Sequence, residues 1–155
     1  MPEKETLRRA GADKRAGKSA STQAGEFVRE EVHHVREGKH GARSTKQAIA
    51  IGLSKARRAG VKLPPPRGGK ARTRRSAAAA MRASRKRSRP SAARSRGVRR
   101  ALKREGRRAV SRKALSRQAT SAARRRSPAS RSAAARKAAR TRQRQGTMRR
   151  RRATA

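Results

Sequence analysis

Cysteine, tryptophan and tyrosine are absent from this chain of 155 residues, and Phe27 is its only aromatic residue. Without cysteine there are no disulfides, no thiolate zinc sites and no cysteine nucleophiles. Only 32% of the residues are hydrophobic, and most of these are alanine, which excludes a core of ordinary size. No apolar run approaches the roughly 18 residues of a membrane span, and the N-terminus lacks the apolar segment of a secretory signal. We therefore expect a cytoplasmic protein that does not engage a membrane.

Acidic residues are also scarce, with 8 against 49 lysines and arginines, for a formal charge of +41. The charge is uneven: residues 67–155 hold 34 basic residues and one acid, Glu105, whereas residues 1–66 hold 15 basic residues and 7 acids. Such an excess predicts a polyanionic partner. The 37 arginines outnumber the 12 lysines, and the guanidinium fork suits phosphate, which favours nucleic acid. No cofactor is expected.

Apolar residues in the stretch 24–37 predict one amphipathic helix. At about 100° per residue, its apolar positions, which include Phe27 and Val35, fall within an arc of roughly 140°. Gly38 stands where a left-handed residue would end the helix. The sequence therefore predicts one buried stripe on this helix.

A second helix is predicted over residues 44–59. Ser44 and Gln47 have the spacing of a capping box, and Gly60 ends the helix before three consecutive prolines. Gly52 lies on the apolar face and would allow close approach of the first helix. The two helices predict a helical hairpin, on which Val61 and Leu63 fold back as a small hydrophobic clasp.

Changes in composition divide the chain into four segments. We assign residues 1–20 to a basic flexible arm, 21–63 to the hairpin, 64–70 to a Pro/Gly linker and 71–155 to a disordered tail rich in Arg, Ala and Ser. Helix propensity allows isolated helices within the tail over 77–87, 98–118 and 130–144 once charge repulsion is relieved. The tail's aliphatic residues are too sparse to pack these helices, namely Val98, Leu102, Val110 and Leu115.

The expected fold class is thus mostly α and disordered: a short N-terminal helical hairpin followed by a low-complexity polycationic tail with isolated helices. The hairpin buries little apolar surface, which barely offsets the entropy of ordering it. A homodimer formed through the hairpin, or a bound polyanion, would complete its stability.

The loop between the predicted helices is the best candidate for a defined phosphate contact. Two glycines and three cationic side chains surround the N-terminus of the second helix, whose amides attract anions. The alternative interpretation is an exposed connection in which the glycines serve only the turn. The candidate residues of this loop are Lys39, His40, Arg43, Ser44, Thr45 and Lys46.

In the tail, each basic side chain that meets a phosphate releases counterions and so drives binding without sequence preference. The absence of stacking aromatics argues mildly for a duplex over single strands. Paired or clustered arginines are the tail's candidate nucleic-acid contacts: Arg74, Arg75, Arg99, Arg100, Arg107, Arg108, Arg124, Arg125, Arg126, Arg149, Arg150, Arg151 and Arg152.

The three histidines, His33, His34 and His40, do not predict a metal site. Adjacent histidines on a helix point about 100° apart, and their only carboxylates at i, i+4 spacing are Glu30 for His34 and Glu37 for His33. The many serines lack an activating base and orienting acid, so no catalytic residue and no enzyme activity are expected. Ser127 and Pro128 form either a turn or a phosphorylation site.

Two resemblances bear on function. The tail, in pieces such as Arg89-Pro-Ser-Ala-Ala-Arg94 and Arg126-Ser-Pro-Ala-Ser-Arg131, is similar in composition to the C-terminal domain of linker histones and to bacterial histone-like proteins. The stretch from Glu26 to Gly60 resembles a family of small basic bacterial proteins of unassigned function, some labelled DNA-binding or plasmid stabilisation. The tail differs from linker histones in preferring arginine and in lacking a winged-helix domain.

Together these patterns predict a histone-like, nucleoid-associated protein that binds and compacts DNA by phosphate neutralisation. Two alternatives remain open at this point. One is a protein of RNA or ribosome assembly, and the other is an adaptor whose hairpin binds a protein partner while the tail tethers it to nucleic acid.

Overall fold

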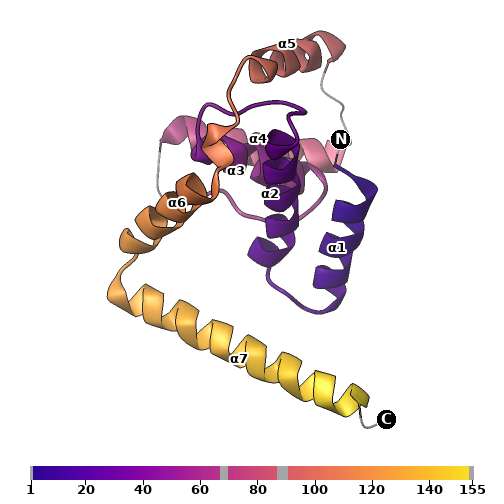
Figure 1. Cartoon of the computed structure of the whole chain (residues 1–155). Helices are drawn as coiled ribbons and strands as arrows, with labels where there is room; N and C mark the ends of the chain where they lie inside the picture. Colours follow the sequence, from indigo (N-terminus) through magenta and orange to yellow (C-terminus); the bar gives the residue numbers. More distant parts are fainter. Residues whose placement is uncertain (1, 67–69, 87–90, 154–155) are drawn as a thin grey trace. The chain divides into compact units, whose positions relative to one another are not determined.

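The computed structural model describes residues 2–66, 70–86 and 91–153, and within these ranges the protein is helical and contains no strand (Figure 1). Its elements are α1 (Lys4–Arg15), α2 (Ala20–Arg36), α3 (Thr45–Arg58), α4 (Ala71–Lys86), α5 (Ala92–Lys103), the short 3-10 helix η1 (Arg108–Val110), α6 (Arg112–Arg124) and α7 (Pro128–Ala153). The chain divides into two compact units, residues 1–115 and 116–155, and each is described by itself.

The two helices predicted over 24–37 and 44–59 are present as α2 and α3, and they pack against each other. Gly52 makes the close approach possible, because a Cβ there would lie 2.7 Å from the Val28 Cα. Helix α2 begins four residues earlier than predicted. Its N-cap is Ser19, whose hydroxyl accepts a hydrogen bond from the Thr22 amide at 3.4 Å.

The capping box of α3 differs in one detail from the prediction. The Ser44 hydroxyl accepts from the Gln47 amide at 3.2 Å, as expected. The Gln47 side chain, however, accepts from the Arg43 amide at 2.7 Å, one residue before the N-cap. The start of the helix and the end of the preceding loop are therefore fixed together.

Glycines in the left-handed region follow α1, α2 and α3, with φ of 67° at Gly17, 79° at Gly38 and 91° at Gly60. In each case the glycine amide and the next amide donate back to carbonyls in the last helical turn; after α2, Gly38 donates to Val35 and Lys39 to His34. This is the Schellman arrangement. The terminations predicted at Gly38 and Gly60 are confirmed.

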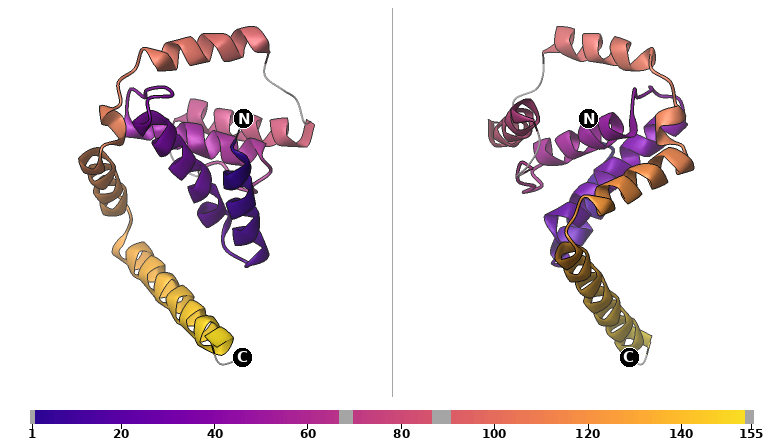
Figure 2. Two further views of the ribbon diagram at one scale, coloured as in Figure 1. Left: turned by 45° about the vertical axis from the view of Figure 1, so that its right-hand side comes forward. Right: turned by 90° about the vertical axis from the view of Figure 1, so that its left-hand side faces the viewer.

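Helix α1 lies against α2 within a first apolar cluster (Figure 2). The stretch 1–20, assigned from sequence to a flexible arm, thus contains a helix that buries Thr6 and Ala10. The cluster gathers Phe27 of α2, Ala56 of α3, and the two residues of the predicted clasp, Val61 and Leu63. Arg57 holds the clasp in place, because its guanidinium donates to the carbonyls of Leu63 at 3.0 Å and Pro64 at 3.3 Å.

The predicted fold class, a short hairpin followed by a disordered polycationic tail, is wrong, because helices continue through the tail as α4, α5, α6 and α7. One reason is local: alanine and arginine favour helix. The second is packing: α4 lies against α3 and buries Ala77 and Ala80. The Gly68–Gly69 part of the predicted linker lies outside the described residues.

The tail's aliphatic residues were expected to be too sparse to pack, and for Val110 this is wrong. Val110 is only 1% exposed and joins Val32, Val35, Ala42 and Ala48 in a second apolar cluster, which residues Ala109 and Leu115 flank. Polar contacts hold the segment there, since the Arg36 guanidinium donates to the Val110 carbonyl at 3.2 Å and the Thr45 hydroxyl to Ala109 at 2.6 Å. Val98 fits the expectation, at 54% exposed.

Serine caps begin three helices of the former tail. Ser91, Ser111 and Ser127 each accept from the amide three residues later, at 3.2 to 3.3 Å. Ser127 is followed by Pro128 at the first helical position of α7, where proline costs nothing because that amide has no partner in a helix. The Ser127-Pro128 pair is thus a helix start. Among the described residues no helix is long and apolar enough to cross a bilayer.

Candidate functional site

The loop predicted to bind phosphate is only partly available to a ligand. It is pinned to the end of α5 by two backbone hydrogen bonds, from Gly41 to Leu102 at 2.8 Å and from Ala42 to Gly106 at 3.0 Å. A Cβ at Gly41 would collide with the backbone of Glu105, so only glycine fits this position. The loop glycine thus serves a contact between two chain segments and not only a turn.

Most of the candidate side chains in this loop have partners within the protein. Lys39 Nζ lies 3.0 Å from Glu37 and 3.2 Å from Glu3, and both carboxylates raise its pKa. Ser44 caps α3, and Thr45 donates to Ala109. His40 is turned inward, toward Glu31.

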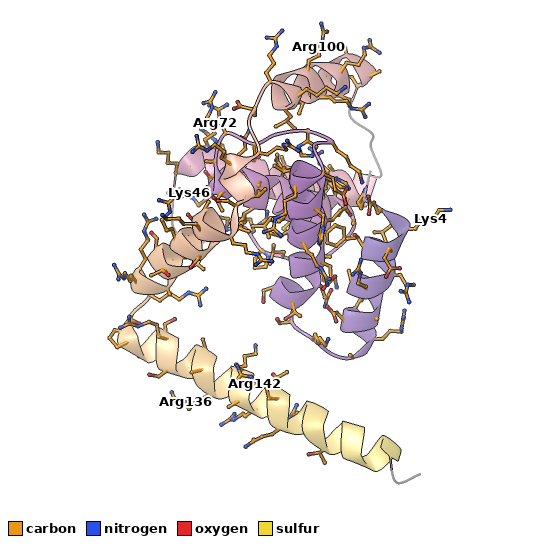
Figure 3. The ribbon with its side chains drawn as sticks, viewed as in Figure 1. Lys4, Lys46, Arg72, Arg100, Arg136 and Arg142 are labelled. Carbon is orange, nitrogen blue, oxygen red and sulfur yellow. The ribbon has the colours of Figure 1, made fainter. Side chains whose placement is uncertain are left out.

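Arg43 and Lys46 are the members of the set that remain exposed. The Arg43 side chain is 83% exposed, with a loose contact of 3.6 Å to Glu105. Lys46 is exposed on the first turn of α3 (Figure 3). The loop therefore presents two cations at a helix N-terminus, fewer than the sequence predicts.

The candidate arginines of the tail lie on separate helices and are exposed wherever their side chains are described. Arg74 and Arg75 lie on α4, Arg99 and Arg100 on α5, Arg107 and Arg108 at η1, and Arg124, Arg125 and Arg126 at the end of α6. Arg149, Arg150, Arg151 and Arg152 lie on the last turns of α7, and their side chains fall outside the described part. The candidates are distributed along successive helices.

Helix α7 carries further cations that were not among the predicted contacts. Every side chain from residue 128 to 144 is exposed. The basic residues in this range are Arg131, Arg136, Lys137, Arg140, Arg142 and Arg144. The prediction considered only paired or clustered arginines and therefore left these residues out. The sequence does show that residues 116–155 contain 14 basic residues and no acid.

A second constellation, absent from the sequence predictions, centres on two buried carboxylates of α2. Glu31 is 0% exposed and Glu30 5%. Lys55 of α3 reaches both, with Nζ 2.8 Å from Glu31 Oε2 and 3.1 Å from Glu30 Oε1. One ammonium group therefore faces two carboxyl groups, and its single positive charge can balance only one of them.

The surroundings shift the pKa values of this group. Burial opposes ionisation of Glu30, but hydrogen bonds from the Thr6 hydroxyl, the Glu3 amide (3.1 Å) and Lys55 outweigh it and lower its pKa. Burial likewise opposes the charge on Lys55, but pairing with Glu31 and Glu30 raises its pKa. Glu30 and Lys55 are thus charged at neutral pH, and their contacts tie α1 and α3 to α2.

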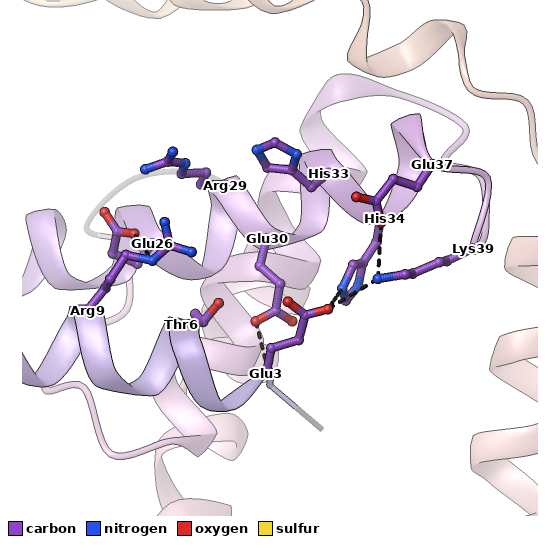
Figure 4. Close-up of a pocket in the computed structure, with 10 residues that line it drawn as sticks. All are labelled: Glu3, Thr6, Arg9, Glu26, Arg29, Glu30, His33, His34, Glu37 and Lys39. Atoms are coloured by element: carbon purple, nitrogen blue, oxygen red, sulfur yellow. Dashed lines mark hydrogen bonds and ion pairs between the residues drawn. The ribbon is translucent and has the colours of Figure 1, made fainter.

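Glu3, ahead of α1, extends the constellation toward the surface (Figure 4). Its Oε1 lies 2.7 Å from His34 Nε2 and 3.2 Å from Lys39 Nζ, and these contacts lower the pKa of Glu3. The residues line a shallow pocket with Glu37 and with Arg9, Glu26 and Arg29 further along.

The sequence contains a signal for Glu31 as a buried residue. Glu31 lies about 40° from Phe27 around α2, inside the apolar arc of the helix.

Comparison with known proteins gives one match. Residues 12–67 match the model of a family of unknown function (DUF6496). The matched stretch runs from the last turn of α1 through α2 and α3 to the clasp, and so contains Glu30, Glu31 and Lys55. No curated protein and no solved structure matches the chain.

The resemblance of residues 26–60 to a family of unassigned function is confirmed by this match. The family's description names no activity, ligand or partner. The matched stretch also stops before the strongly basic helices, so the basic tail lies outside it.

Proposed function

We propose that this protein is a histone-like, nucleoid-associated protein that binds duplex DNA without sequence preference and compacts it. The observation that carries the proposal is the surface of α7: from residue 128 to 144 all side chains are exposed, six of them are basic, and no acid is present in residues 116–155. Cations without acidic neighbours are fully available to neutralise phosphates. The loop cations Lys39 and Arg43 instead form ion pairs with Glu3, Glu37 and Glu105.

The placement of charge around α7 supports compaction as well as binding. At about 100° per residue, Arg131 and Arg142 lie within roughly 20° of each other. Arg136, Arg140 and Arg144 lie on roughly the opposite side of the helix. A cationic rod with two charged faces can contact two duplexes at once, and such bridging draws DNA segments together.

Other features agree with this proposal. The tail resembles linker-histone tails in its Ala, Arg, Ser and Lys composition. Phe27, the one Phe, Tyr or Trp residue of the chain, is 1% exposed and so is not available to stack on bases. This favours binding through the phosphate backbone, as expected for a protein indifferent to sequence.

The test compares two full-length variants of equal charge. In the first, the six basic residues of 128–144 become glutamine. The second removes six exposed cations of the N-terminal unit that are not candidate phosphate contacts, namely Lys4, Lys14, Arg15, Arg29, Arg58 and Lys62. Affinity for a duplex of random sequence is measured across a salt series.

We expect the α7 variant to lower the slope of log K against log salt by up to about 5, because each phosphate contact contributes about 0.9. The matched variant should change it much less. Equal losses in both variants would contradict the assignment to α7. Competition with structured RNA completes the test: RNA that competes at least tenfold better per phosphate than the duplex would contradict DNA as the partner.

Compaction is tested separately by condensation of long DNA, followed by light scattering. A variant with Arg131 and Arg142 changed to glutamine, or one with Arg136 and Arg140 changed, should bind with modestly lower affinity but lose condensation. Condensation unaffected by either pair would contradict bridging by the two faces of α7.

A further inference from the structure

The acids of this chain are concentrated at one place. Four of its 8 acidic residues, Glu3, Glu30, Glu31 and Glu37, meet around Lys39 and Lys55. Four carboxylates facing two ammonium groups leave two negative charges in a protein whose total is +41. Close to these groups lie the imidazoles of His34 and His40.

Within this group, Glu31 has an incomplete set of partners. Its side chain is 0% exposed, and neither oxygen receives a hydrogen bond of good angle from the described residues, although Lys55 forms an ion pair with Oε2 at 2.8 Å. Oε1 faces His40 Nε2 at 3.4 Å, and the two atoms form no hydrogen bond. A buried carboxylate oxygen without a donor is costly, and it calls for a cation.

The tautomer of His40 also favours a cation beside Glu31 Oε1. His40 Nδ1 lies 3.1 Å from the Gly41 carbonyl oxygen, which can only accept, so Nδ1 carries the proton. In the neutral ring Nε2 then presents a lone pair toward Glu31 Oε1. Two lone pairs facing each other repel unless a cation lies between them. A protein carbonyl on the far nitrogen is also the common support of a metal-binding histidine.

The distance between these two atoms suits a metal ion. Zinc lies about 2.0 to 2.1 Å from imidazole nitrogen and about 2.0 to 2.2 Å from carboxylate oxygen, so two such ligands at a tetrahedral angle are about 3.3 to 3.5 Å apart. The observed separation is 3.4 Å.

His34 supplies a third ligand from the same face of α2 as Glu31, three residues along. The ligand atoms of Glu31, His34 and His40 all lie within 4.8 Å of one another. The rings of His34 and His40 meet edge to face, with centroids 6.1 Å apart. Glu3 holds His34 Nε2 at 2.7 Å and restrains that ring.

We propose that Glu31, His34 and His40 form a binding site for a divalent transition-metal ion, with zinc best suited to their two nitrogens and one oxygen. The ion joins α2 to the loop of residues 38–43 and completes the charge balance that Lys55 leaves unfinished. With three protein ligands and no sulfur, the fourth position is left to water. The site is independent of the DNA-binding surface of α7.

The test uses the full, untagged chain, freed of nucleic acid with nuclease and high salt and of metal with a chelator. Calorimetric titration with Zn²⁺ should show one equivalent bound, and Co²⁺ should give the intense visible absorption of a tetrahedral site. His40→Gln and His34→Gln should each weaken Zn²⁺ binding by more than tenfold. His33→Gln is the matched control, because His33 lies on the same helix but is exposed and outside the ligand set.

A second readout keeps the test independent of folding defects in the variants. In the unaltered protein, Zn²⁺ should move the ring ¹⁵N resonances of His34 and His40, leave those of His33 in place, and slow amide exchange in residues 38–43. The proposal is overturned if no stoichiometric Zn²⁺ binding occurs, if His33→Gln weakens binding as much as His40→Gln, or if the ring resonances show His40 doubly protonated and unresponsive to Zn²⁺.

Discussion

Helices α2 and α7 begin with the same device, a serine cap, yet they stand in different surroundings. Six of the 17 residues of α2 are buried, whereas every described side chain of α7 from 128 to 144 is exposed. Both sequences favour helix locally. What separates them is periodicity: α2 repeats large apolar residues on one face, and α7 has alanine and arginine on all sides. The comparison shows that helix formation and core formation are separate properties of this chain.

The two helices also differ in how charge is used. Acids on α2 and α1 pair with Lys39 and Lys55 inside the N-terminal unit, so charge there contributes to tertiary structure. In residues 116–155 no acid is present to pair with. Charge in one region is structural, and in the other it is available to an external polyanion.

Lys55→Met is the substitution expected to lower stability most. It leaves Glu30 and Glu31 buried without a cation, which should lower the free energy of unfolding of the N-terminal unit by about 4 kcal/mol. Amide hydrogen exchange resolved by fragments is the suitable measurement, because it separates α2 and α3 from α7. Lys137→Met on α7 is the control and should leave exchange in α2 unchanged; equal effects would mean that Lys55 has no structural role.

Gly52→Ala tests the close approach of α2 and α3. The added methyl would lie 2.7 Å from the Val28 Cα, and backbone cannot move aside cheaply, so we expect a loss of about 3 kcal/mol in chemical denaturation followed by circular dichroism. Gly146→Ala on α7 meets nothing within 4 Å and should instead favour helix by about 1 kcal/mol. The same sign for both substitutions would contradict the contrast between the two helices.

Val110→Ala tests whether the segment after α5 belongs to the core. Removing two methyl groups from a side chain that is 1% exposed should cost about 2 kcal/mol, measured by thermal unfolding. Val98→Ala, at 54% exposure, should cost less than about 0.5 kcal/mol. A negligible effect of Val110→Ala would show that residues 104–115 do not contribute to the core.

The smallest expected effect is a loss of stability at acidic pH. Because the pKa of Glu30 is lowered in the folded protein, its contribution is present above its ordinary value of about 4.5 and is lost as pH falls through the folded pKa. Urea unfolding at several pH values should show this decline, and Glu30→Gln should flatten it. Glu5→Gln, on an exposed carboxylate, should alter the decline less; an unchanged decline in Glu30→Gln would contradict the assignment.

Much of the N-terminal fold was predictable because its signals are local. Gly38 and Gly60 end helices by their own conformational freedom, and Ser44 caps α3 through a residue three positions away. The same kind of signal at Ser91, Ser111 and Ser127 was present in the sequence and would have predicted the later helices. The prediction of disorder gave net charge too much weight against caps and helix propensity.

The candidate site was predictable only as a composition. The abundance of exposed arginine follows from counting, but the pairing of Lys39 with Glu3 and Glu37 does not, nor does the inward turn of His40. These contacts join residues up to 36 positions apart, and no local rule links them.

Propensity, capping and charge are properties of short stretches, so a helix-forming polycation with a small amphipathic region can be predicted from the residues alone. Three features depend instead on contacts between distant segments: Val110 completes a core, Gly41 meets the backbone of Glu105, and Glu31, His34 and His40 converge. Burial and contact depend on which distant segments pack together, and neither composition nor local spacing specifies that packing in this chain.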